Sequence, residues 1–178
     1  MMRKKEMLWE IALFLLIVNL GIACGAGLYE SQITFPQWLV ETETGERVWN
    51  ADAARSADVG LGFWVYVTTV PMTLLLIVNG VGAWKCLERT RGWWLAAVIL
   101  LTLERLGTFG YFIPAMIQLM AEDPSLAPEL AVRNASRWEL LNTGRHLLSF
   151  AAWFSALIAW RIMGSEGREE FKAKSFGS

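Results

Sequence analysis

Four long apolar blocks dominate the chain, and polar segments separate them. The blocks cover residues 7–28, 59–84, 92–120 and 138–163. Each block is long enough for a helix that crosses a hydrocarbon core of about 30 Å, which needs roughly 20 residues. The pattern therefore predicts an all-α membrane protein, with residues 1–163 forming a bundle of four transmembrane helices.

The first block follows a basic start, which is also how a signal peptide begins. Its apolar stretch is about 20 residues, whereas the core of a signal peptide has roughly 7–15. We therefore expect the block to be retained as a helix, with cleavage as the alternative.

The segment between the first two blocks, residues 30–58, is long enough to have structure of its own. Residues 32–35 and 47–49 are rich in β-prone side chains, and a turn signal at Thr44-Gly45 lies between them. These runs predict a small β-hairpin. Trp38 and Trp49 alternatively lie at the level of the lipid headgroups, where amphipathic aromatic side chains are favoured. Residues 164–178 are expected to form a mobile, charged tail.

Lys and Arg are distributed unequally over the segments that flank the blocks. Basic residues occur before the first block, between the second and third, and after the fourth: Arg3, Lys4, Lys5, Lys85, Arg89, Arg91, Arg161, Arg168, Lys172 and Lys174. The other two connections are acidic, with Glu41, Glu43, Glu46, Asp52, Asp58, Glu122, Asp123 and Glu129. The positive-inside rule then places both termini in the cytoplasm, which an even number of spans allows. We expect a protein of the bacterial inner membrane.

Composition and charge narrow the class of partner. Hydrophobic residues make up 54% of the chain and charged residues 19%, with a net charge of -1. A chain without an excess of positive charge creates no field that attracts nucleic acid. We therefore expect lipid and a lipophilic small molecule as partners, no nucleic acid, and either a monomer or a homo-oligomer.

Ionisable residues inside the third and fourth blocks are the strongest indication of a site. An ionisable side chain at the centre of the bilayer costs about 2.5–3.5 kcal/mol or more, so it is paired or faces a cavity. At about 1.5 Å per residue, Glu104 lies at the same depth as Arg145 and His146. We expect these three residues to meet in a polar pocket, where His146 handles protons and Arg145 holds a negative charge. Arg105, about 100° from Glu104 around the helix, is expected to face elsewhere.

Other polar or aromatic residues fall on the helix faces that should turn inward. Six of them are candidates for ligand binding: Glu30, Tyr111, Glu139, Asn142, Asn79 and Trp153. Pro71 is expected to kink the second helix and to free carbonyl groups toward the interior.

Two alternatives compete with a binding pocket. In the first, Glu104 and Arg145 form a structural ion pair that only holds the helices together. In the second, His146 with Glu30, Glu104 and Glu139 binds iron or manganese. The chain has one histidine and no Glu-x-x-His motif, so no metal and no other cofactor is favoured.

Short motifs along the whole chain resemble the anthrone oxygenase-like family of four-helix membrane proteins. They are Gly27-Leu28-Tyr29-Glu30 with Pro36-Gln37-Trp38, Tyr111-Phe112-Ile113-Pro114, and Trp138 followed by His146-Leu147-Leu148-Ser149-Phe150-Ala151-Ala152-Trp153. The resemblance implies that Arg145 and His146 are the basic pair of the fourth helix. It also implies oxidation of a lipophilic compound by dioxygen without metal or flavin. Ala115-Met116 departs from the family, which often has an asparagine after Pro114.

Two function hypotheses follow from these features. The first is a cofactor-independent, oxygenase-like oxidoreductase acting on a lipophilic molecule, with His146, Arg145 and Glu104 as its catalytic residues. The second is a non-catalytic membrane scaffold, small-molecule binder or complex subunit. Transport is disfavoured because four helices show no broken-helix repeat, unless the protein is a dimer.

Overall fold

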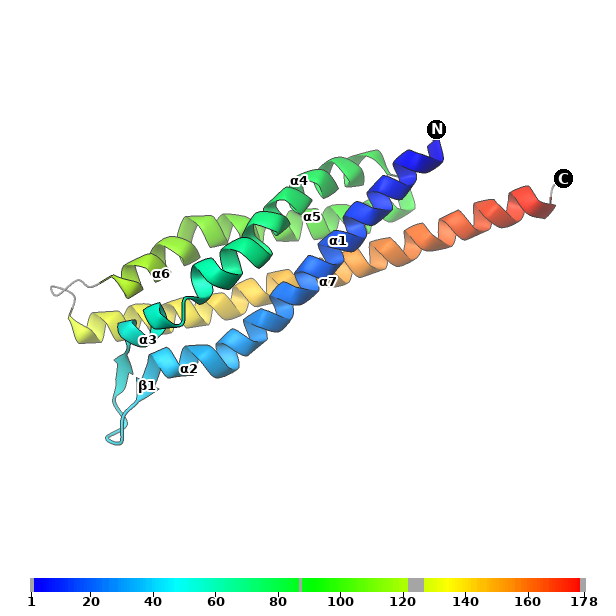
Figure 1. Ribbon diagram of the computed structural model, residues 1–178. Coiled ribbons are helices and arrows are strands. Elements are labelled where there is room, and N and C mark those ends of the chain that lie inside the picture. The colour runs from blue at the N-terminus through cyan, green and yellow to red at the C-terminus, as the bar shows by residue number, and fades with distance from the viewer. Residues whose placement is uncertain (1, 87, 122–126, 177–178) are drawn as a thin grey trace.

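The computed structural model describes residues 2–86, 88–121 and 127–176. Within this part of the chain, four helical runs are long and apolar enough to cross a membrane: Met7–Trp38, Gly60–Lys85, Arg89–Met120 and Pro128–Ser165. The four runs lie side by side in one elongated bundle, with both termini at the same end (Figure 1). The expected four-helix membrane architecture is confirmed.

Several of these runs are divided by changes of helix type. The elements are α1 (Met2–Tyr29), η1 (Glu30–Thr34), α2 (Phe35–Trp38), β1 (Leu39–Glu41), β2 (Arg47–Trp49), α3 (Ala51–Ser56), η2 (Gly60–Thr69), α4 (Val70–Lys85), α5 (Glu88–Gly107), η3 (Thr108–Phe112), α6 (Ile113–Met120) and α7 (Pro128–Phe176). The elements η1, η2 and η3 are π-helical. The backbone of α7 stays helical well past residue 163, where the fourth helix was expected to end. The expected mobility of residues 164–178 stays a prediction.

A two-stranded sheet connects the first two spans at what we call the hairpin end of the bundle, opposite the end that carries the termini (the terminal end). Strands β1 and β2 are antiparallel, with Leu39 opposite Trp49 and Glu41 opposite Arg47. The left-handed Gly45, with φ of 81°, lies in the connecting turn. The second strand was predicted correctly. The prediction of a first strand at residues 32–35 is wrong, because the helix of the first span continues through them to Trp38.

Each π-helical segment is followed directly by an α-helix that has proline as its second residue. The three prolines are Pro36, Pro71 and Pro114. Proline has no N–H to donate, and its ring crowds the carbonyl group four residues earlier. The wider π-helical turn, with i→i+5 hydrogen bonds, places the preceding carbonyl groups differently and accommodates the ring. Pro71 is thus preceded by a π-helical segment, a feature that the expected kink did not include.

Small side chains and one buried tryptophan hold the terminal end together. Trp94 is fully buried against Gly82, where an added Cβ atom would lie 2.9 Å from the indole ring. Three alanines that are also fully buried, Ala97, Ala156 and Ala159, allow α5 and α7 to approach closely. This end of the bundle is therefore tightly packed.

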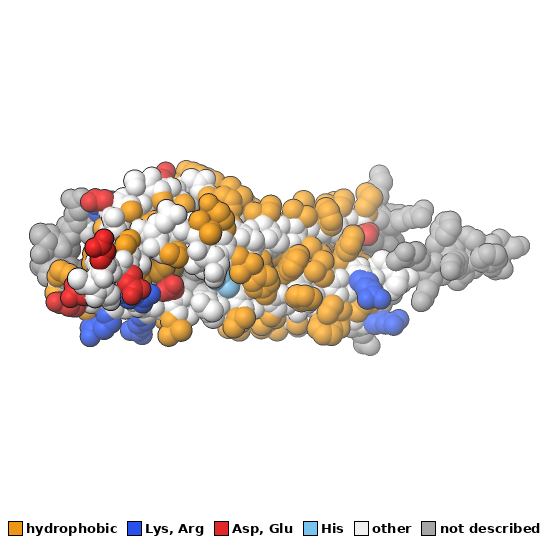
Figure 2. All heavy atoms as spheres, turned by 90° about the horizontal axis from the view of Figure 1, so that it is seen from below, with side chains coloured by type: hydrophobic (Ala, Val, Ile, Leu, Met, Phe, Trp, Pro, Cys, Tyr) orange, Lys and Arg blue, Asp and Glu red, His pale blue; other side chains and the backbone are white. Residues whose placement is uncertain are grey.

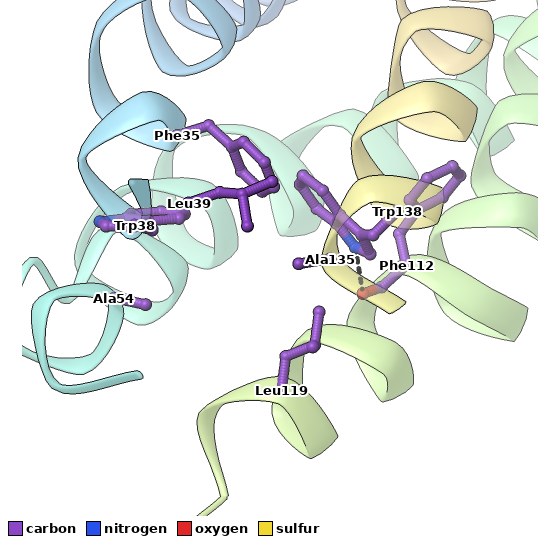
Figure 3. Packing of buried hydrophobic residues seen from close by; sticks show 8 residues of the cluster. All are labelled: Phe35, Trp38, Leu39, Ala54, Phe112, Leu119, Ala135 and Trp138. Atoms are coloured by element: carbon purple, nitrogen blue, oxygen red, sulfur yellow. Dashed lines mark hydrogen bonds between the residues drawn. The ribbon is translucent and has the colours of Figure 1, made fainter. Parts of the chain in front are cut away.

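Aromatic side chains form a separate core at the hairpin end (Figure 3). Phe35 stacks on Trp138 with ring centroids 5.4 Å apart, and it also contacts Trp38. The indole Nε1 of Trp138 donates to the Phe112 carbonyl over 3.1 Å. Trp38 and Trp138 are buried in this core and thus tie the first span to the third and fourth.

Apolar side chains cover the middle of the bundle, whereas charged side chains lie toward its two ends, with most of the acidic ones in view around the hairpin end (Figure 2). Many of the large apolar side chains of the spans are exposed, among them Leu74, Ile77, Ile99, Leu106 and Leu147. Exposed apolar surface along four membrane-length helices is lipid-facing surface. The structure thus describes an integral membrane protein whose spans contact lipid.

Candidate functional site

A buried charged cluster lies between α5, η3 and α7. The Glu104 side chain is 2% exposed and accepts hydrogen bonds from Arg105 Nε over 2.5 Å and from Arg105 Nη2 over 2.8 Å. Its Oε1 also accepts from Thr108 Oγ1 over 2.9 Å. Arg145 Nη1 approaches the same oxygen at 3.5 Å. Glu104 and Arg145 therefore do meet inside the bundle.

Arg105 does not face elsewhere, as its helical position had suggested. Its long side chain bends back onto the neighbouring carboxylate and is itself 9% exposed. A carboxylate that water cannot reach is stabilised most by a guanidinium that donates two hydrogen bonds. Arg105 supplies that pair of bonds, whereas Arg145 makes only the longer contact with Glu104.

A chain of hydrogen bonds connects Arg145 to the first span. Arg145 Nε donates to Asn142 Oδ1 over 2.8 Å, and Asn142 Nδ2 lies 3.1 Å from His146 Nε2. Ser31 Oγ lies 3.3 Å from the same histidine nitrogen. Because the amide oxygen of Asn142 faces a donor, its nitrogen must donate to His146. His146 Nε2 is therefore an acceptor, and the ring is the neutral tautomer protonated on Nδ1.

His146 packs against the backbone of α1. A Cβ atom added to Gly27 would lie 2.3 Å from the imidazole Cε1, so only glycine leaves room for the ring. His146 does not line the large pocket described below. The expected meeting of Glu104, Arg145 and His146 thus occurs through Asn142, and His146 holds α7 against α1.

A pocket of about 630 Å³ lies beside the charged cluster, in the half of the bundle toward the hairpin. It is lined by residues of all four spans and of α3: Glu30, Trp38, Ala54, Arg55, Asp58, Val59, Gly60, Leu61, Trp64, Val65, Thr69, Thr108, Phe112, Ile113, Met116, Ile117, Met120, Ala121, Trp138 and Arg145. Most of the lining is apolar. Volumes of roughly 300–1,000 Å³ with a few polar groups are typical of small-molecule sites.

Two charged groups face this pocket with hydrogen-bonding capacity left over. Arg145 Nη2 makes no hydrogen bond to any described residue, and the same is true of Glu30 Oε2. Neither atom belongs to the fully buried polar atoms without a partner, so both keep accessible surface. The other carboxylate oxygen, Glu30 Oε1, accepts from Trp64 Nε1 over 2.7 Å. Arg145 and Glu30 thus line one cavity, and each has one polar atom without a hydrogen bond to a described residue.

Aromatic rings hold the Arg145 guanidinium in place. Its central carbon lies 5.0 Å from the centroid of Phe112 and 5.8 Å from that of Trp64. Stacking of this kind is favourable for arginine and restricts its side-chain freedom. The guanidinium is therefore pre-positioned at the inner end of the pocket.

The other predicted binding residues lie away from the pocket. Asn79 donates to the Ala12 carbonyl over 3.0 Å and accepts from Trp94 Nε1 over 3.0 Å, in the terminal half of the bundle. Glu139 lies 3.8 Å from Arg47 at the hairpin end. Each of these residues has a structural partner.

Trp153 and Tyr111 also face other neighbours. Trp153 packs against Gly21, and its Nε1 is buried with no hydrogen-bond partner among the described residues. Tyr111 lines a smaller hollow between α6 and α7 with Gln118, Asn134 and Arg137. Of the nine predicted site residues, the structure places Arg145 and Glu30 on the pocket, with Glu104, Asn142 and His146 behind them.

Sequence reasoning missed several residues of the pocket wall, and Phe112 shows why. An α-helical turn places Tyr111 on the face of Glu104 and Thr108. The segment Thr108–Phe112 is π-helical, which adds residues to the turn and brings Phe112 onto that face instead. The available signal was Pro114, since each π-helical segment in this chain precedes a proline.

No group of three His, Cys, Asp or Glu side chains suited to a metal ion occurs within the described parts of the chain. The residues considered for iron or manganese are dispersed: Glu139 is near Arg47, and His146 Nε2 accepts hydrogen bonds from Asn142 and Ser31.

Comparison with protein-family models, curated proteins and solved structures finds no match for this chain.

Proposed function

We propose that this integral membrane protein binds a lipophilic small molecule in the pocket and that Arg145 holds the polar group of that molecule. The observation that supports the proposal is Arg145, which lines a largely apolar cavity and whose Nη2 makes no hydrogen bond to any described residue. A guanidinium donates strongly to carboxylate, enolate or carbonyl oxygens, and more so where water is scarce. The apolar walls suit a hydrocarbon or aromatic body.

Arg145 is a suitable residue for a test because Glu104 does not depend on it. In an Arg145→Gln variant, Glu104 keeps both bonds from Arg105 and the bond from Thr108. The protein should therefore fold. The variant removes the charged donor at the pocket and leaves the apolar walls in place.

We expect native mass spectrometry of the gently purified protein to detect a bound small molecule that is lost in Arg145→Gln. The Arg47→Gln variant is the matched control, because Arg47 is an exposed arginine at the hairpin end that does not line the pocket. It should retain the ligand. Absence of any ligand from the unmodified protein, or equal retention by both variants, would contradict the proposed function.

A second candidate function is oxidation of the bound molecule by dioxygen, as the resemblance to anthrone oxygenase-like proteins implies. The observation that favours it is the carboxylate of Glu30 facing the same cavity as Arg145. Glu30 would take a proton from an acidic C–H of the substrate, and Arg145 would stabilise the enolate oxygen. The resulting carbanion would pass its electrons to dioxygen as a C–O bond forms, and the peroxide anion would take the proton back from Glu30 to give a hydroperoxide.

This candidate assigns the base to Glu30 and not to His146, whose Nε2 already accepts hydrogen bonds from Asn142 and Ser31. With a substrate that the unmodified protein oxidises, we expect Glu30→Gln to abolish oxygen consumption. We expect His146→Gln to retain it, because the glutamine side chain can still accept a hydrogen bond from Asn142. An oxygen electrode with protein in nanodiscs measures both. Full activity of Glu30→Gln would exclude the carboxylate as the base.

A further inference from the structure

The pocket has an arginine at each end, and the one at the inner end, Arg145, still has an unused hydrogen-bond donor among the described contacts. Its lining runs along the third span from Thr108 to Met120, which is roughly 18 Å at about 1.5 Å of rise per residue. At the hairpin end, Arg55 donates to the Met120 carbonyl over 2.6 Å and pairs with Asp52. At the inner end, Arg145 Nη2 has no partner among the described residues.

The hairpin segment covers the end of the pocket that lies at the hairpin end of the bundle. Helix α3 lies there, and its Arg55 bonds the last carbonyl of α6. Trp49 Nε1 donates to the neighbouring Leu119 carbonyl over 2.8 Å. These two bonds tie the connection between the first spans to the end of α6, so a ligand arriving from water would meet a covered end.

The side of the pocket opens toward lipid. Leu61 of η2 and Ile117 of α6 both line the pocket, yet they are 55% and 61% exposed. They therefore form the rims of an opening between the second and third spans. Helix α4 packs on α5 at the terminal end, and no comparable packing joins η2 to α6 among the described residues. The two spans thus separate toward the hairpin, and apolar side chains border the gap.

Combining these observations, we infer that the ligand is a long-chain amphiphile with one acidic group, that it enters sideways from the membrane leaflet on the hairpin side, and that its acidic group reaches Arg145. This inference rests on the proposed function. An apolar path of roughly 18 Å suits an extended aliphatic chain. The acid supplies an acceptor for Arg145 Nη2, the guanidinium nitrogen that makes no hydrogen bond to a described residue, in addition to the ion contact of Arg145 with Glu104.

Glu30 gives the inference a second, opposite prediction. Its carboxylate faces the same cavity, so it repels a second acidic group at short range. Removing its charge should therefore strengthen binding of an acid, whereas removing the charge of Arg145 should weaken it. Binding of a neutral lipophilic molecule would not change in opposite directions in the two variants.

The test uses the full-length protein in phosphatidylcholine nanodiscs and a long-chain fatty acid that carries a diazirine on its chain. After illumination, mass spectrometry locates the cross-links. We expect labelling of the pocket wall, at Val65 and Met116, and about a tenfold loss in Arg145→Gln, which corresponds to the loss of one charge-assisted contact. Glu30→Gln should raise the labelling. The fatty alcohol with the same diazirine should label the wall weakly.

Access is tested with bulky rim substitutions. Ile117→Trp should slow labelling of the pocket, and the control Ile99→Trp, at a lipid-exposed position of α5 that does not line the pocket, should not. Unchanged labelling rates in Ile117→Trp would overturn sideways access. Labelling that is spread evenly over lipid-facing residues, or that is unaffected by Arg145→Gln, would overturn the inference that the ligand is an acidic amphiphile. If a different molecule copurifies and depends on Arg145, the proposed function stands while this inference fails.

Discussion

Glu104 lies between two guanidinium groups, and its contacts with them differ. Arg105 makes two short hydrogen bonds to the carboxylate, whereas Arg145 approaches one oxygen at 3.5 Å. The structural role expected for a Glu104–Arg145 ion pair is therefore filled mainly by Arg105. Arg145 is held instead by Asn142 and by two aromatic rings, which leaves part of its guanidinium for another partner.

Removing the carboxylate should destabilise the protein more than removing either arginine. In Glu104→Gln, two buried guanidinium groups lose their common counter-charge, and loss of one partner from a buried pair costs about 3–5 kcal/mol. We expect a clear fall in the melting temperature in detergent. The double variant Glu104→Gln, Arg105→Met removes one of the two unpaired charges and should recover part of the loss. A melting temperature for Glu104→Gln equal to that of the unmodified protein would show that the cluster contributes little to stability.

At the scale of the elements, the contact between α1 and α7 depends on the absence of a side chain at Gly27. The imidazole of His146 occupies the space where a Cβ atom would lie, and Ser31 and Asn142 fix the ring there. The first span could not pack as closely on the fourth with any larger residue at this position. Gly25, two residues earlier on the same helix, has nothing within 4 Å of an added Cβ atom.

The two glycines therefore make a matched pair for a stability measurement. Gly27→Ala should lower the free energy of unfolding by about 1–3 kcal/mol, as overpacking typically does. Gly25→Ala should be neutral or slightly stabilising, because alanine favours helix over glycine. Thermal unfolding in detergent, followed by circular dichroism, compares them. The double variant Gly27→Ala, His146→Ala removes the ring and should restore stability, and equal effects of the two single variants would refute this account of the contact.

On the scale of the whole molecule, the hydrophobic pattern predicted the number and order of the spans because lipid imposes a length on each of them. It also placed Glu104 and Arg145 together, since unpaired charge at that depth is costly. It did not predict which of two adjacent residues faces which way. Arg105 has a side chain long enough to bend back, and the π-helical turn before Pro114 exchanges the positions of Tyr111 and Phe112. At both points, the side-chain directions expected for a regular α-helix differ from those in the structure.

The three prolines that follow the π-helical segments have a consequence for how quickly a ligand could bind. Their rings are covalent parts of the chain, so the local geometry that they impose is present before any ligand arrives. A cavity that exists in advance requires no conformational opening, and little of the binding energy is lost in reshaping the protein. The rate of ligand association would then be set by lateral diffusion of the ligand within the bilayer.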